Sequence, residues 1–308
     1  MGEGTQADRQ LPRGEEIFLD HVGHFVRDPQ AASRALARAG FAPTPISVQT
    51  QPDSTGAPRL TGTGNVTAML ARGYVEVLFK TADTPLGGEL EAAVARHVGV
   101  HLVAFSVADA GSAHQRLQQN GFRVRPLVDM QRPVDTGGKL GTAAFSVARL
   151  EPGEMPEGRI QLLTHRTEQM VWQPRWLSHP NGAIGLTNVV VAVSDLDEAG
   201  QRFERLTGRL PRASSFGQSF DLDRGSLDLV TASTFALMCP QIPIPSLPFI
   251  GAYGIEVGSL ETAERSLRQG GLSFQRLGGR CLVAAFPLEL GCGAWLFSYP
   301  SGASADRR

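Results

Sequence analysis

The stretch LDHVGHFVRDPQAASRALARAGF, residues 19–41, joins a strand-like apolar run to an acidic residue, a helix-period segment and a glycine. The same order recurs at residues 100–122, 186–208 and 252–274, with Ser259 in place of the acidic residue in the last copy. A repeat on this scale defines the architecture before any single residue is interpreted. The residue that opens each helical segment precedes the glycine by 12 or 13 positions, in the pairs Asp28 and Gly40, Asp109 and Gly121, Asp195 and Gly208, and Ser259 and Gly271.

Each copy predicts one strand and one capped helix. The Asp or Ser side chain suits the N-cap, because its oxygen can accept a free backbone N–H, and the glycine suits the position after the helix. Strand-like pieces separated by glycine or proline follow every helix. The sequence therefore predicts an α+β fold of four βαβββ units. Loops are expected to interrupt the units at residues 49–61, 129–138 and 235–248.

Length, charge and composition exclude several classes of function. The 308 residues allow about two domains. A net charge of -1 leaves no electrostatic footprint for nucleic acid or an anionic membrane. No apolar run approaches the roughly 18 residues of a membrane span, and the first residues lack an apolar signal core. Three cysteines without a CxxC pattern suit a reducing compartment. A cytoplasmic protein is expected, with neither nucleic acid nor membrane as partner.

Four βαβββ units in pairs resemble the vicinal oxygen chelate superfamily, which includes glyoxalase I, extradiol dioxygenases and bleomycin-resistance proteins. LDHVGHFVRD is typical of that superfamily's opening strand. The segment THRTEQMVWQPRWLSHPNGA, residues 164–183, more specifically resembles the glyoxalase-like domain subfamily. The resemblance implies that paired units form two half-open barrels of the glyoxalase/bleomycin-resistance/dioxygenase type. It also implies a divalent metal held by the first and last strands of each unit.

The paired units predict two domains. The first glyoxalase-like domain is expected at residues 17–166 and the second at residues 184–300. A Trp- and Pro-rich linker, residues 167–183, is expected to pack onto the first barrel. Residues 1–16 are expected to form a disordered tail, and residues 301–308 a second tail.

The resemblance implies particular metal ligands in the first domain. His21 matches the opening strand and Glu76 the closing strand of unit one, and Gln161 lies in register with Glu76 in unit two. The fourth position has alternatives. His101 lies eight residues before its helix cap whereas His21 lies seven before its own, so strict counting puts Leu102 at the ligand position. His165, at the end of the same strand as Gln161, is another candidate.

The second domain is expected to carry a degenerate site. All seven histidines lie at or before residue 179. The positions of the second domain that match the ligand positions of the first are Asn188, Asp228, Ala252 and Leu296. Two of them, Ala252 and Leu296, have side chains that cannot bind a metal. Any metal site is therefore predicted in the first domain.

Two functions remain open at this stage. Imidazole and carboxylate are normal donors for Fe, Zn, Mn or Ni, and a metal with open positions polarises a chelated carbonyl or enolate. The first hypothesis is a metal-dependent lyase, isomerase or ring-cleaving dioxygenase acting on a small oxygenated substrate. In it His21 and Glu76 are catalytic residues and metal ligands, His101 or His165 completes the metal site, and Gln161 contacts the substrate.

The alternative is a metal-free protein of the bleomycin-resistance type, which binds or sequesters a small molecule in an apolar pocket. The distinguishing feature is whether His21, Glu76 and a second histidine converge on one point. Because four units are fused in one chain, a monomer can complete both barrels, and either a monomer or a homodimer is expected.

Overall fold

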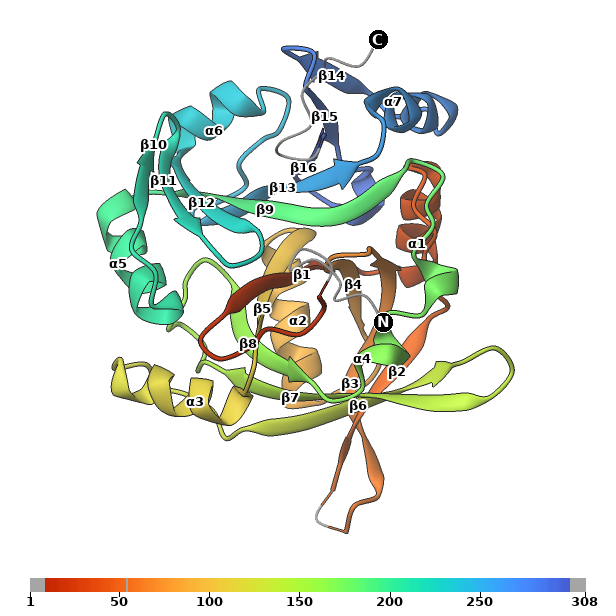
Figure 1. The fold of residues 1–308 in the computed structure, drawn as a ribbon, viewed down its shortest axis with the longest axis vertical. Helices are drawn as coiled ribbons and strands as arrows, with labels where there is room; N and C mark the ends of the chain where they lie inside the picture. The colour runs from red at the N-terminus through yellow and green to blue at the C-terminus, as the bar shows by residue number, and fades with distance from the viewer. Residues whose placement is uncertain (1–8, 54, 300–308) are drawn as a thin grey trace.

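The computed structural model describes residues 9–53 and 55–299, and its strands form a closed barrel followed by a second, open sheet (Figure 1). The neighbour order in the barrel is β1-β4-β3-β2-β6-β7-β8-β5. Its strands are β1 (Ile17–Phe25), β2 (Ser47–Pro52), β3 (Pro58–Met69), β4 (Tyr74–Lys80), β5 (Gly99–Val107), β6 (Val128–Asp135), β7 (Leu140–Arg149) and β8 (Arg159–His165).

The second sheet repeats the arrangement without closing, in the order β10-β11-β12-β9-β13-β16-β15-β14. In both halves the first strand of a unit pairs in parallel with the last, and the first strands of the two units pair antiparallel. The strands are β9 (Ala183–Val193), β10 (Arg212–Ser214), β11 (Gly217–Asp221), β12 (Ser226–Thr231), β13 (Phe249–Val257), β14 (Phe274–Leu277), β15 (Cys281–Ala285) and β16 (Ala294–Ser298).

The four repeated helices begin where the sequence predicts. Asp28, Asp109, Asp195 and Ser259 each accept a backbone N–H from the first turn, which confirms them as N-caps. The helices are α1 (Pro29–Arg38), α3 (Ala110–Gln119), α5 (Leu196–Thr207) and α7 (Leu260–Gln269).

Two of the expected loops are strands instead. Residues 49–52 and 58–61 belong to the paired strands β2 and β3, and residues 129–135 belong to β6. A pairing between Thr50 and Gln131 joins these two strands and closes the barrel. The prediction was wrong here because paired backbone hydrogen bonds outweigh the weak strand propensity of these polar, Pro-containing stretches.

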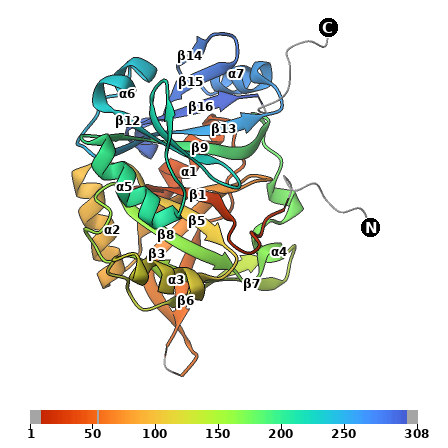
Figure 2. The ribbon, with the colours of Figure 1, turned by 60° about the vertical axis from the view of Figure 1, so that its left-hand side comes forward.

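Both ends of the barrel interior are filled by segments outside the repeat. Helix α2 (Pro85–Arg96) packs Leu90 and Val94 in one apolar cluster with Phe25 and Leu102, and Figure 2 shows it beside the barrel strands, at the left. The segment containing α4 (Glu168–Val171) and η2 (Pro174–Trp176) covers the other end, where Trp172 is buried among apolar side chains. The linker therefore packs onto the first barrel, as the sequence predicts.

In the second sheet, α6 (Ala232–Met238) covers the face that would line a site. Its Phe235 is buried in an apolar cluster with residues of β9, β12, β13, β15 and β16. Figure 2 shows α6 and α5 on opposite sides of β9 and β12. Of the matching positions, Asn188 donates to Asp228 at 2.7 Å, while Ala252 and Leu296 belong to the apolar cluster. This sheet therefore encloses apolar side chains where the first barrel has its polar interior.

Part of the expected N-terminal tail is fixed to both halves. Gln10 donates to the backbone carbonyl of Ala71, and Arg224 donates to that of Arg9. The remainder of that tail, residues 1–8, lies outside the described residues, as does the expected C-terminal tail at residues 301–308. Among the described residues, no helix combines the length and apolar character needed to cross a membrane.

A buried histidine joins the two halves of the chain. His24 donates from Nδ1 to the Leu290 carbonyl at 2.9 Å and accepts at Nε2 from the Tyr253 hydroxyl at 2.9 Å. Burial lowers the pKa of His24 to about 4, against the opposing effect of the Leu290 carbonyl. The neutral imidazole is therefore the form that holds the halves together.

This contact predicts acid sensitivity. The unfolded chain protonates His24 near its ordinary pKa of 6.5, so the folded state loses stability as the pH falls from 6.5 to 4. We expect the difference in free energy of unfolding between wild type and His24→Asn to narrow by about 3 kcal/mol across that range. Urea unfolding at several pH values measures it, with His114→Asn as control. A difference that stays constant with pH would contradict the assignment.

Candidate active site

A cavity lies inside the first barrel, between α2 and the linker. Its volume is about 50 Å³, which admits the centres of only a few water-sized groups. Alternate residues of the barrel strands point into it, as they do in any closed barrel. The polar and ionisable side chains that line it are His21, Gln49, Asn65, Tyr74, Glu76, Gln131, Arg132, Arg149, Arg159 and Gln161.

His21 is held on two sides. Its Nδ1 lies 2.7 Å from Asp20 Oδ1, and its ring stacks on Tyr74 with centroids 4.3 Å apart. The β1–β5 register shifts between Leu19 and His21, so Asp20 is the extra residue of a bulge. A bulge re-aims side chains, which lets two consecutive residues meet. Because the carboxylate accepts a hydrogen bond from Nδ1–H, the Nε2 lone pair of His21 is left for the cavity.

Asp20 is fully buried between two imidazoles. Its Oδ2 lies 2.8 Å from Nε2 of His165, which comes from the far strand β8. Burial opposes ionisation of Asp20, yet the facing imidazoles of His165 and His21 hold the pKa of its carboxyl well below the usual range. Trp172 packs edge-on against His165, with ring centroids 4.6 Å apart. His165 therefore supports Asp20 from behind and does not line the cavity.

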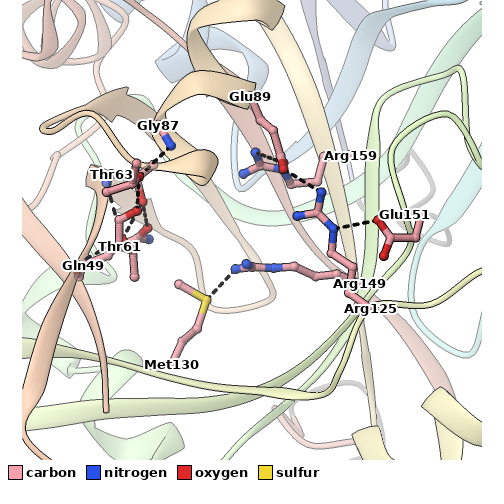
Figure 3. Close-up of polar contacts among 11 residues, drawn as sticks. Gln49, Thr61, Thr63, Gly87, Glu89, Arg125, Met130, Arg149, Glu151 and Arg159 are labelled. Carbon is pink, nitrogen blue, oxygen red and sulfur yellow. Dashed lines mark hydrogen bonds and ion pairs between the residues drawn. The ribbon is translucent and has the colours of Figure 1, made fainter. Parts of the chain in front are cut away.

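Glu76 has one oxygen occupied and one directed at His21. Its Oε1 accepts from Asn65 at 2.6 Å and from Gln49 at 3.3 Å. Gln49 in turn accepts from Thr63 at 2.6 Å, a contact visible in Figure 3. Glu76 Oε2 lies 3.6 Å from His21 Nε2, beyond direct hydrogen-bond distance. An imidazole nitrogen and a carboxylate oxygen thus face one another beside the cavity.

Of the residues predicted for the site, His21, Glu76 and Gln161 meet around this cavity and two others do not. His101 lines a separate cavity, and its Nε2 is bonded to the His97 carbonyl at 2.8 Å. Leu102 lines the cavity in place of His101, as strict counting along the sequence predicts. The second histidine required by the metal hypothesis therefore does not converge on His21 and Glu76.

The donor set does not fit a resident divalent metal. Such ions usually take three protein ligands at a catalytic site. Nowhere in the described part of the chain do three His, Cys, Asp or Glu residues come together to hold one. His165 is committed to Asp20, and three arginines among the lining residues would repel a cation. The expected four-ligand set of His21, Glu76, His101 and His165 is not assembled.

Comparison with known proteins agrees with this fold. The family model of the glyoxalase-like domain matches residues 19–207, more than half of the chain. The chain belongs to the glyoxalase-like domain family. No curated protein gives a significant match.

Solved structures share the fold of this glyoxalase-like chain at low sequence identity. A hypothetical protein from Staphylococcus aureus is 10% identical with a TM-score of 0.60, over 92% of this chain and 99% of that one. A variant of 4-hydroxymandelate synthase from Streptomyces coelicolor is 16% identical with a TM-score of 0.57, over 94% of each chain. A xylose isomerase-like TIM barrel/4-hydroxyphenylpyruvate dioxygenase fusion protein is 10% identical with a TM-score of 0.55, over 97% of this chain and 51% of that one.

Sequence reasoning missed Asp20 and the arginines of the cavity. Asp20 lies in a strand whose nine residues are all buried, which is a signal that it has a buried partner. Arg132 and Arg149 lie at inward positions of β6 and β7. The inward direction of Arg132 could be read only once β6 was known to be a strand.

The contact between Asp20 and His21 predicts a single tautomer. We expect His21 to carry its proton on Nδ1 in the wild type, and Asp20→Asn to shift that preference and cost about 1–3 kcal/mol of unfolding free energy. Long-range proton–nitrogen NMR reads the tautomer, with His114 as an internal reference. Observation of the Nε2-protonated form of His21 in the wild type would refute the orientation.

Proposed function

We propose that the first barrel is the active site of an enzyme that moves a proton on a small molecule. His21 is the general base and Glu76 the second proton-carrying group. The observation that supports this most is the buried Asp20, which accepts a hydrogen bond from Nδ1–H and leaves the Nε2 lone pair beside the Glu76 carboxylate. A base oriented by a buried carboxylate is a recurring catalytic arrangement.

The proposed step keeps protons and electrons in balance. His21 Nε2 takes a proton from a carbon next to a substrate carbonyl, and the electron pair of that bond passes to the carbonyl oxygen. Asp20 stabilises the imidazolium that forms. Return of this proton to a neighbouring atom, directly from His21 or after its transfer to Glu76 Oε2, completes an isomerisation. In an elimination the electron pair returns from the oxygen to expel a leaving group, which takes the proton from His21.

Tyr74 is placed to assist this step. Its ring contacts His21 and it lines the cavity. Burial raises the pKa of the Tyr74 hydroxyl well above its ordinary value, and the negative charges of Asp20 and Glu76 add to that effect. The hydroxyl therefore stays protonated and can donate to the oxygen that gains charge.

A second candidate function is binding without catalysis. The incomplete set of metal ligands supports it. Metal-free proteins of the superfamily that this chain resembles, those of the bleomycin-resistance type, bind small molecules in a barrel of the same kind. In that case His21 and Glu76 would serve as polar anchors for a ligand, and substitution at either would weaken binding without abolishing any reaction.

Solvent-deuterium exchange tests the proposed function. We expect the wild-type protein to exchange the α-protons of a compound in a panel of small 2-oxo acids and hydroxyketones. His21→Ala should lower the rate by about 10²–10⁴-fold, since that is the usual contribution of a general base. Glu76→Gln should lower it as well, and His114→Ala, outside the barrel, should leave it unchanged. Mass spectrometry measures the incorporated deuterium.

Three results would count against the proposal. Exchange that persists in His21→Ala would remove its role as the base. Elemental analysis of untagged protein is the second check. Near-stoichiometric metal that disappears in a His21→Ala/Glu76→Ala double variant would restore the metal-dependent hypothesis. Ligand binding without exchange in the wild type would favour the binding protein.

A further inference from the structure

We propose that Arg132 and Arg149 form a carboxylate-binding subsite in the barrel cavity. The molecule that the cavity takes is then a small carboxylate. This inference rests on the proposed function only in assuming that the cavity binds a small molecule, and it adds the chemical class of that molecule.

Arg132 is buried without a partner. Its residue is 9% exposed, and it lines the cavity from β6. Its guanidinium makes no hydrogen bond or ion pair with any residue that the structure describes. Burial lowers the pKa of Arg132, and the nearby Tyr74 and Glu76 oppose that effect only in part. A guanidinium has five N–H donors, and those of Arg132 border the cavity without an acceptor from the described residues.

Arg149 has an equally poor set of partners. It is the last residue of β7 and lies opposite Gln161 of β8. Its Nη2 donates only to the thioether of Met130, a weak acceptor, and its Nε is buried without any partner (Figure 3). Burial, with the positive charges of Arg159 and Arg125, lowers the pKa of Arg149 to about 9. The side chain thus remains charged at neutral pH without a neutralising carboxylate.

Two neighbouring arginines, in contrast, have carboxylate partners. Arg125 donates to Glu89 at 2.6 Å and to Glu151 at 3.3 Å, and Arg159 lies 3.5 Å from Glu89 (Figure 3). Of the three arginines that line the cavity, Arg159 has a carboxylate partner, whereas Arg132 and Arg149 have none among the described residues. Both line the cavity, where a ligand can supply the acceptor that the chain does not.

The charge and size of the cavity select the ligand. Its ionisable lining has three arginines against the single carboxylate of Glu76, which already accepts from two amides. A carboxylate matches a guanidinium through two parallel hydrogen bonds. The volume of about 50 Å³ leaves room for only a few heavy atoms. The Met130 thioether is a weak acceptor on an unbranched side chain with several rotatable bonds, so a carboxylate can replace its sulfur at Arg149.

The first test needs no ligand. If the charge of Arg149 is neutralised only by a bound anion, Arg149→Met should raise the Tm of the ligand-free protein by about 2 °C, because the substitution removes an unpaired buried charge. The matched control Arg125→Met removes a guanidinium that has two carboxylate partners, and it should lower the Tm. A fall in Tm for Arg149→Met as large as that of the control would show a structural role and overturn the subsite.

The second test uses acetate, glyoxylate, pyruvate and oxalate at constant ionic strength, with pyruvamide as the uncharged match for pyruvate and inorganic phosphate as a different anion. We expect calorimetry to detect binding of at least one carboxylate, weakened about 10- to 100-fold by Arg149→Met or Arg132→Met and unchanged by Arg125→Met. Absence of carboxylate binding, tighter binding of phosphate, or equal binding of pyruvamide would overturn the proposal.

The same proteins separate this inference from the proposed function. His21→Ala should lose deuterium exchange while it still binds the carboxylate. Exchange on neutral ketones without carboxylate binding would leave the proton-transfer proposal intact and remove the subsite. Carboxylate binding without exchange would do the reverse.

Discussion

The buried carboxylate of Asp20 is the interaction on which the first barrel depends. It binds His21 on its own strand and His165 on β8, so it joins the opening strand of unit one to the closing strand of unit two. Burial of a carboxylate is tolerated only when its oxygens are hydrogen-bonded. The bulge at Asp20 and the packing of Trp172 on His165 both serve that requirement. The orientation of His21 toward the cavity follows from it.

The two halves show how one fold yields both a polar cavity and a solid core. In the first barrel, closure through β2 and β6 brings ionisable residues of several strands to one interior. In the second sheet the corresponding face meets α6, and Phe235 fills the space with apolar contacts. The apolar half supports the other through His24, which bonds to Leu290 and Tyr253.

Local features of the chain were predictable, and long-range ones were not. Four N-caps and the position of Leu102 follow from spacing along one segment, and each agrees with the structure. The pairing of Asp20 with His165 spans 145 residues and depends on a bulge, which spacing does not reveal. The inward direction of Arg132 required β6 to be a strand, whereas its sequence favours a loop.

One electrostatic constraint connects the missing metal ligands with the arginines. A divalent cation needs several anionic or imidazole donors within one coordination sphere, and guanidinium groups nearby oppose its binding. In this barrel Leu102 lies where a donor would stand, and Arg149 lies beside Gln161 on the neighbouring strand. Each difference weakens cation binding, and the second favours an anion. A carboxylate ligand held by Arg132 and Arg149 would share the cavity with His21 and Glu76, so its charge would be met by guanidinium groups where a metal would otherwise have been required.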